Sequence, residues 1–329
     1  MSKLNNHLSK NAVSIAIFLF VIAIVLVVFS FLSPVFMTKN NILRAIKHLS
    51  ITSIAALGLT FVITVGYSDM SFHFVSCFAG MTMSFFIGKM VLPPLPSIFF
   101  GLLAGCIFGV INGIAVGKYK LPDMIATIGI GSFAWGMAYL YSKGNYIYEN
   151  FLTSGIINFC DGKLYGIPYP VIYLFVFYTL AYIFLHRTKY GRGFYATGSN
   201  QVAALFSGIN IENYIISAYV ISNVLSSFTN MVMTAAQGNG NVKGGLVLLM
   251  PAYSAVFIGM SIFRKPTIIG TFCGSFLISI IQNGFTLLNA PFYFMDMTMG
   301  ATLIISIIIS KIEFKRKKEM SEISQVEAE

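Results

Sequence analysis

Long uninterrupted apolar runs constrain this chain more than any other feature of its sequence. The first run, residues 12–32, contains no charged side chain. A helix rises about 1.5 Å per residue, so about 20 apolar residues cross the hydrocarbon core of a bilayer. A signal peptide has a shorter apolar region that ends in small residues, so this run is interpreted as a permanent membrane span.

The composition excludes a soluble protein. Of the 329 residues, 57% are hydrophobic and only 10% are charged, and the mean hydropathy is +0.80. A soluble fold could not cover such a chain with a polar surface. The sequence therefore predicts an all-α polytopic membrane protein with about ten transmembrane helices. The expected spans are 12–32, 49–65, 72–90, 98–116, 124–141, 171–185, 214–236, 248–263, 267–288 and 295–310.

The basic residues predict the orientation. With the amino terminus inside, fourteen of the 21 Lys and Arg residues fall in inner segments and seven in outer ones. Because Lys and Arg accumulate on the cytoplasmic side, both termini are expected there. The net charge of +10 then reflects topology and contact with anionic lipid, not binding to nucleic acid. Residues 1–11 are a predicted cytoplasmic tail, 12–310 the transmembrane domain and 311–329 a charged, disordered cytoplasmic tail.

The segment 186–213 is the expected main cytoplasmic loop, because basic residues crowd the end of the span before it. Three glycines, Gly191, Gly193 and Gly198, are expected to let the backbone turn. Asn200 is expected to cap a short helix that Gly208 ends. This small helix would lie across the inner mouth of the membrane domain.

One ionisable cluster lies between the second and third spans, in Gly66-Tyr67-Ser68-Asp69-Met70-Ser71-Phe72-His73. A carboxylate at membrane depth must face a cavity or a partner, so Asp69 is a functional candidate. Gly66 allows the helix to break before it. Alternatively, Asp69 caps the third span in a cytoplasmic turn.

Asparagine–glycine pairs close two long spans, in Gly105-x3-Gly109-x2-Asn112-Gly113 and Gly274-x8-Asn283-Gly284. Small residues at this spacing let helices approach closely in lipid. The first span runs inward and the second outward, which suggests an inverted-topology repeat.

The sequence lacks the motifs of an enzyme. It has no G-x-x-x-x-G-K-[ST], H-E-x-x-H or G-x-S-x-G motif, so this chain is not expected to hydrolyse ATP or to catalyse a reaction at a serine or zinc centre. The four His residues are scattered and the four Cys residues form no C-x-x-C pair, so no metal site is expected.

Several segments together resemble one family. The pattern G-x-N-Q-x-A-A-x-x-S-G-I at 198–209 is similar to the cytoplasmic Ala-Ala-x3-Gly loop of ABC importer permeases of the ribose, xylose, arabinose and galactoside type. Segments 121–129 (L-P-D-M-I-A-T-I-G), 250–259 (M-P-A-Y-S-A-V-F-I-G) and 283–288 (N-G-F-T-L-L) resemble further motifs of these permeases. The matches run in consistent order from about residue 41 to residue 310.

The resemblance implies a function and partners. The chain would form the path for a pentose or hexose across the cytoplasmic (inner) membrane, with a second permease copy or a related permease. ATP, with magnesium, would be hydrolysed on a separate ABC ATPase subunit, and an extracytoplasmic sugar-binding protein would dock outside. This chain would bind no cofactor. Carried over residue by residue, the predicted ATPase-docking residues are Asn200, Gln201, Ala203, Ala204, Ser207 and Gly208, with Arg264 and Lys265 in a second cytoplasmic turn.

The sequence departs from the family pattern at several positions. Gln201 stands where the family usually has Glu, and Leu205 where it has Arg. Tyr67 and His73 replace glycines of the family motif G-G-I-D-L-S-V-G, which suggests a narrower pathway or a different sugar. The turn at 260–266 (M-S-I-F-R-K-P) is stiffer and more basic than the usual glycine-rich turn.

Asp69, Ser71, His73 and Asn112 are the candidate residues of the substrate pathway. Two alternative functions stay open. A proton-coupled secondary transporter would use Asp69 and His73 as its titrating pair. Within the importer class, the substrate could instead be a nucleoside or a furanose signalling molecule.

Overall fold

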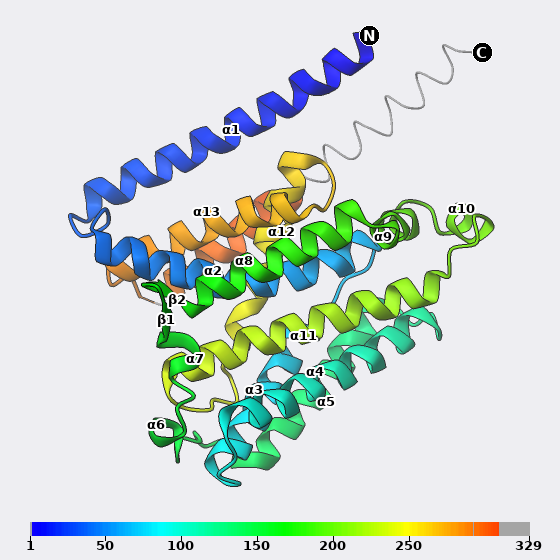
Figure 1. The fold of residues 1–329 in the computed structure, drawn as a ribbon. Helices are drawn as coiled ribbons and strands as arrows, with labels where there is room; N and C mark the ends of the chain where they lie inside the picture. The colour runs from blue at the N-terminus through cyan, green and yellow to red at the C-terminus, as the bar shows by residue number, and fades with distance from the viewer. Residues whose placement is uncertain (1, 292, 309–329) are drawn as a thin grey trace.

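The protein is a bundle of α-helices with a single two-stranded ribbon among the residues that the structure describes (Figure 1). The computed structural model describes residues 2–291 and 293–308. The charged tail predicted at 311–329 lies outside the described residues.

Within the described residues, eight helices are long and apolar enough to cross a membrane. Two shorter apolar helices, α3 (Phe72–Gly88) and Tyr293–Ile308, coincide with the two remaining predicted spans. The all-α polytopic class is therefore confirmed, while the number of crossings and the side of the termini stay predictions. The eight are α1 (Ser2–Leu32), α2 (Lys39–Thr64), α4 (Pro94–Gly117), α5 (Asp123–Ser142), α8 with η1 (Tyr169–Tyr182, Ile183–Arg187), α11 (Ile211–Gln237), η2 with α12 (Leu246–Leu248, Leu249–Phe263) and α13 (Ile268–Leu287).

Helix α2 starts earlier than the predicted span at 49–65. The Thr38 side chain accepts a hydrogen bond from the Asn41 backbone N–H and caps the helix. The buried Asn41 and the partly buried Asn283 then exchange two side-chain hydrogen bonds of 2.9 and 3.0 Å, which fix this first turn on α13. The helix therefore includes the polar residues before the predicted span.

Two short helices, α9 (Lys189–Ser199) and α10 (Gln201–Phe206), mark one end of the bundle, called here the α10 end (Figure 1). Helix α2 ends there and α11 begins there. The predicted orientation assigns this end to the cytoplasm.

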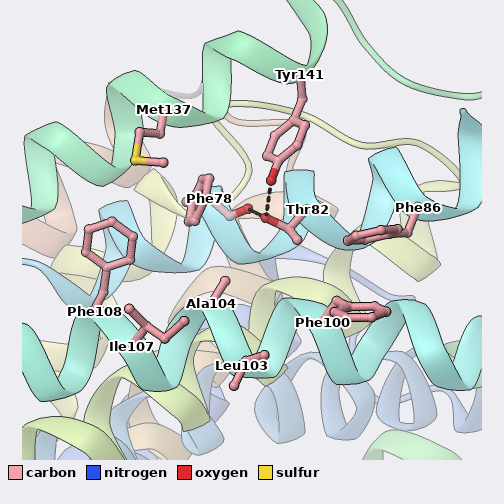
Figure 2. Close-up of a pocket in the computed structure, with 10 residues that line it drawn as sticks. All are labelled: Phe78, Thr82, Phe86, Phe100, Leu103, Ala104, Ile107, Phe108, Met137 and Tyr141. Carbon is pink, nitrogen blue, oxygen red and sulfur yellow. Dashed lines mark hydrogen bonds between the residues drawn. The ribbon is translucent and has the colours of Figure 1, made fainter. Parts of the chain in front are cut away.

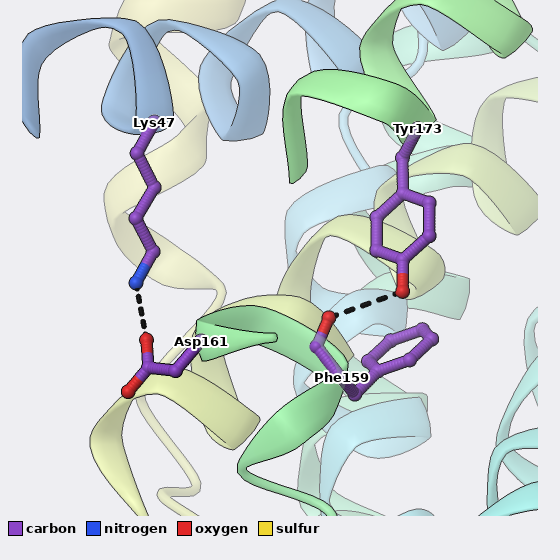
Figure 3. A network of polar contacts seen from close by, with 4 residues as sticks. All are labelled: Lys47, Phe159, Asp161 and Tyr173. Carbon is purple, nitrogen blue, oxygen red and sulfur yellow. Dashed lines mark hydrogen bonds and ion pairs between the residues drawn. The ribbon is translucent and has the colours of Figure 1, made fainter. Parts of the chain in front are cut away.

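The opposite end carries α6 (Phe151–Ser154), α7 (Asn158–Asp161), β1 (Lys163–Leu164) and β2 (Ile167–Pro168). The antiparallel strands turn at Tyr165 and Gly166, both with positive φ, as tight hairpins require. Figure 3 shows how α7 is tied to its neighbours: Asp161 pairs with Lys47 of α2, and the Tyr173 hydroxyl donates to the Phe159 carbonyl at 3.1 Å.

The chain contains two similar interruptions, one in each half. Helix α2 ends at Thr64, and a non-helical segment leads to α3, which has only 17 residues. Helix α11 ends at Gln237, and the segment 238–245 leads through η2 to α12, which has only 15 residues. The first interruption follows the end of a helix at the α10 end, and the second follows the end of a helix at the opposite end (Figure 1).

Helix contacts follow the same pattern in both halves. Helix α3 packs on α4 and α11, while α12 packs on α13 and α2. Helix α4 in turn packs on α11, and α13 on α2. This exchange of partners supports the predicted inverted repeat, with α2–α3–α4 corresponding to α11–α12–α13.

The predicted close approach at small residues is confirmed. A Cβ on Gly109 would lie 2.7 Å from the Val220 Cα, and a Cβ on Gly274 would lie 1.9 Å from the Ala255 carbonyl oxygen. The backbones of α4 and α11, and of α12 and α13, therefore touch without intervening side chains.

We expect Gly274→Ala to lower the stability of the protein by about 1–3 kcal/mol, because the added methyl group would meet backbone that cannot move aside. Gly129→Ala is the matched control, since Gly129 lies in α5 with open space around it. Thermal unfolding in detergent compares the two. Equal midpoints would show that α12 and α13 do not depend on this contact.

Candidate functional site

The candidate site is built around the segment that joins α2 to α3. Gly66, with φ +88°, ends α2, and two backbone hydrogen bonds close the turn, from Gly66 to Ile63 and from Tyr67 to Val62. Beyond this turn the backbone is neither helix nor strand, and it lies in the interior of the bundle. Each of its N–H groups then requires an acceptor from elsewhere in the protein.

Side chains from other elements supply these acceptors. Ser68 N–H donates to the Asp123 carboxylate at 2.7 Å, and Met70 N–H donates to the Thr127 hydroxyl at 3.0 Å. Asp69 N–H lies 3.1 Å from the Tyr253 hydroxyl, which itself donates to the Asp69 carbonyl. Helices α5 and α12 therefore hold the segment from two sides.

The Asp69 carboxylate is fully buried and connects the segment to a third helix, α11. One oxygen accepts from the Ser71 N–H and hydroxyl, and the other from the Ser222 hydroxyl at 2.8 Å and the Asn223 amide at 3.0 Å. The carboxylate thus meets four donors, two at the start of α3 and two on α11. Hydrogen bonds of this kind compensate a buried negative charge.

The structure brings Asp69, Ser71 and Asn112 together and leaves His73 apart. The Asn112 amide of α4 donates to the Ser71 hydroxyl at 2.8 Å, and both residues are buried. The His73 ring instead lies against the Phe74 ring at an angle of 35°, and its Nδ1 has no hydrogen-bond partner among the described residues. The four donors to the Asp69 carboxylate do not include His73.

The position of Asp69 does not match a simple helix cap. Its carboxylate accepts the N–H of Ser71, but Ser71 is itself the N-cap of α3, and no side chain makes a cap hydrogen bond there. The side chain is also buried among helices and is not exposed in a turn. Its role in a substrate pathway stays a prediction.

The sequence interpretation missed the partners on α11. These partners, Ser222 and Asn223, belong to a set of polar residues on one face of α11, since residues three or four apart lie on the same side of a helix. Asn230 donates to the Ser76 carbonyl and Ser226 to the Phe72 carbonyl. A polar stripe within a predicted span was the signal that could have revealed this face. The stripe consists of Tyr219, Ser222, Asn223, Ser226 and Asn230.

The predicted short helix in the loop 186–213 is confirmed as α10. The Asn200 side chain accepts from the Ala203 N–H at 3.0 Å. Gly208 adopts φ +76°, and the backbone bonds from Gly208 to Leu205 and from Ile209 to Ala204 close the helix. Ser207 donates to the Ala203 carbonyl.

The expected turns at Gly191, Gly193 and Gly198 were wrong, because all three glycines lie inside α9. They allow close packing instead. A Cβ would lie 1.9 Å from the Leu185 carbonyl at Gly191, 2.2 Å from the Tyr214 ring at Gly193 and 2.0 Å from the Thr64 carbonyl at Gly198. Helix α9 therefore packs directly against the ends of η1, α11 and α2.

Helix α9 also contacts the second predicted cytoplasmic turn. The Tyr195 hydroxyl donates to the Pro266 carbonyl at 2.7 Å, and the Lys265 ammonium lies 5.6 Å from the centre of the Tyr195 ring. Burial raises the pKa of Tyr195 to about 12, so its hydroxyl remains a donor at neutral pH. Arg264, with φ +58°, ends α12 beside this contact.

The outer face of α10 is apolar. Val202, Leu205 and Phe206 are exposed, and Phe206 retains 87% of its accessible surface, while Ala204 is buried against the bundle. Exposed apolar side chains on a short projecting helix are typical of a surface that contacts another protein.

Other features of the structure do not extend this site. Among the described residues, no group of three His, Cys, Asp or Glu side chains could hold a metal ion. A hollow of about 320 Å³ lies between α3, α4 and α5, and Figure 2 shows that aromatic and aliphatic side chains line it. Its polar groups, Thr82 and Tyr141, lie 3.3 Å from each other. Such a lining suits a lipid chain or an apolar side chain, not a hydroxyl-rich ligand.

Comparison with known proteins identifies the family. The family described as branched-chain amino acid transport system / permease component matches residues 41–307. The chain belongs to this permease family. The match includes both interruptions, the Asp69 network and the α9–α10 loop.

Curated relatives match most of the chain. The chain is 29% identical to the D-allose transport system permease protein AlsC of Escherichia coli over 89% of this chain and 90% of the relative. It is 28% identical to the ribose import permease protein RbsC of Bacillus subtilis, over 88% and 90%. It is 26% identical to the L-arabinose ABC transporter permease protein AraH of Azospirillum brasilense, over 91% and 89%. The comparison with solved structures finds no match.

We expect Asp69→Asn to destabilise this permease by about 1–3 kcal/mol, because an amide cannot accept from four donors and leaves buried groups unpaired. Asp161→Asn is the control, since Asp161 is an exposed carboxylate that pairs with Lys47 at the opposite end, where such pairs contribute about 0–1 kcal/mol. Thermal unfolding of both purified variants measures the difference. Equal shifts would contradict the structural role of the carboxylate.

Proposed function

We propose that this chain is the membrane-spanning permease subunit of an ATP-driven importer for a small sugar, in the cytoplasmic (inner) membrane. Membership of the permease family and the names of its relatives, which specify allose, ribose and arabinose, support this function. The α9–α10 unit is the observation that carries the proposal.

The exposed surface of α10 is consistent with binding to a partner subunit that hydrolyses ATP. Helix α10 is closed by caps at both ends and projects from the bundle with Leu205 and Phe206 exposed (Figure 1). The sequence contains no phosphate-binding loop of its own. Closure of a pair of ABC ATPase domains on ATP would push α10, and the spans would alternate between inward and outward openings.

The remaining partners follow from the same function. An extracytoplasmic sugar-binding protein would dock at the opposite end, where Tyr146, Tyr148 and Tyr165 are exposed. A second copy of this chain or a related permease would complete the pathway. Asp69, Ser71, His73 and Asn112 would lie near that pathway, and ATP with magnesium would bind on the ATPase subunit.

We expect Gly208→Trp to lower recovery of the ATPase subunit in an affinity pull-down about tenfold, which corresponds to about 1.4 kcal/mol of lost interaction. Gly208 has open space around it, so the indole would project where the partner sits. Gly238→Trp is the matched control, because Gly238 has φ +67° and open space but follows α11 at the opposite end. The proposal fails if both variants recover the ATPase equally well.

We expect sugar uptake by the reconstituted importer to require ATP and to stop with vanadate. The purified chain alone should show no uptake under an imposed proton gradient, because four hydrogen bonds enclose the Asp69 carboxylate and none of them comes from His73. Proton-driven uptake by this chain alone would support the secondary transporter instead. A panel of ribose, allose, arabinose and nucleosides identifies the substrate class.

A further inference from the structure

A single polar contact joins α10 to the segment that carries Asp69. Gln201, the first residue of α10, donates from its side-chain amide to the Tyr67 hydroxyl at 3.0 Å. Tyr67 follows Gly66 and precedes Asp69 by two residues. The hydrogen bond therefore connects the projecting helix with the turn between α2 and α3.

A backbone contact lies beside this hydrogen bond. Gly198, near the end of α9, packs so closely on the end of α2 that a Cβ would lie 2.0 Å from the Thr64 carbonyl. Gly66 faces the same residue, and its Cβ position is 3.5 Å from the Gly198 Cα. Any movement of α9 and α10 would therefore press directly on the end of α2.

Beyond Tyr67 the segment is fixed to three helices. Ser68 donates to Asp123 of α5 and Asp69 accepts from Ser222 of α11, while Tyr253 of α12 contacts the Asp69 backbone. On the other side, Gly66 adopts φ +88°, where a glycine backbone changes conformation at low cost. If the Tyr67 side chain is displaced, the segment would rotate about Gly66. This rotation would strain the hydrogen bonds that connect the segment to α5, α11 and α12.

We propose that the Tyr67–Gln201 hydrogen bond transmits the movement of α10 to the segment 66–71, so that Tyr67 is a positioning residue for transport. This inference rests on the proposed function. It assigns the phenol of Tyr67 to coupling, whereas the sequence alone suggested that its bulk narrows the pathway.

The two roles of Tyr67 respond differently to substitution. Tyr67→Phe keeps the ring, so a steric role in the pathway would be preserved, but it removes the hydroxyl and with it the hydrogen bond to Gln201. Gln201→Met removes the same hydrogen bond from the α10 side at nearly constant length. Gln201→Glu keeps an acceptor for the Tyr67 hydroxyl.

The test measures ATP hydrolysed per sugar transported by the complete importer in proteoliposomes. We expect Tyr67→Phe and Gln201→Met to raise this ratio about three- to tenfold, the effect of one lost hydrogen bond. The double variant should be no worse than either single variant, because both remove one interaction. Gln201→Glu should raise the ratio less than Gln201→Met does.

Tyr119→Phe is the matched control, since Tyr119 is an exposed tyrosine in the loop between α4 and α5. Recovery of the ATPase subunit should stay at the wild-type value in Tyr67→Phe, and the unfolding midpoint should fall by no more than one lost hydrogen bond explains. A ratio in Tyr67→Phe equal to that of Tyr119→Phe, with the ATPase still bound, would overturn the inference and leave the proposed function intact. A changed KM for sugar at an unchanged ratio would overturn it in favour of a pathway role.

Failure of the wild-type chain to recover any ATPase would overturn the proposed function and this inference together. If Tyr67→Phe does not fold, Gln201→Met tests the same hydrogen bond from a short helix at the edge of the bundle.

Discussion

The bilayer core offers backbone groups no water, and the non-helical segment between α2 and α3 therefore needs hydrogen-bond partners within the protein. Its N–H groups find acceptors on α5, on α12 and in the Asp69 side chain. The carboxylate in turn requires donors, which α11 supplies. The relative positions of these helices are thus tied to one short stretch of irregular backbone.

The second interruption meets the same constraint by different means. The segment 238–245 lies against α3, where a Cβ on Gly245 would meet the Ser76 hydroxyl at 2.0 Å and a Cβ on Gly240 would meet the Ser84 hydroxyl at 2.3 Å. The Trp135 indole donates to the Val242 carbonyl at 2.9 Å. The first interruption is fixed by a buried carboxylate, and the second by backbone that fits closely against two serines of α3, Ser76 and Ser84.

Much of this arrangement follows from sequence, because apolar runs, caps and charge patterns act locally. Most span positions and the α10 helix with its Asn200 cap could be predicted, and Asp69 could be selected as a candidate residue. The partners of Asp69 could not be predicted, because Ser222, which donates to its carboxylate, and Tyr253, which contacts its backbone, are distant in sequence and lie within apolar runs. The glycines of α9 were misassigned for a related reason: a glycine that allows a turn and one that allows close packing look the same until the neighbouring helix is placed. Tyr67 and Gln201 were each noted as departures from the family pattern, but only the fold brings them together.

Helix α1 has a consequence for how the protein is made. The rest of the chain covers little of its surface, and it packs on α12 and α13. These two are the last of the long helices described here to be synthesised. During biogenesis α1 must therefore reside in lipid as a lone helix while most of the bundle assembles without it. Residues 12–32 carry no charged side chain, so α1 is suited to contact lipid on all sides, both before the bundle assembles and in the finished protein.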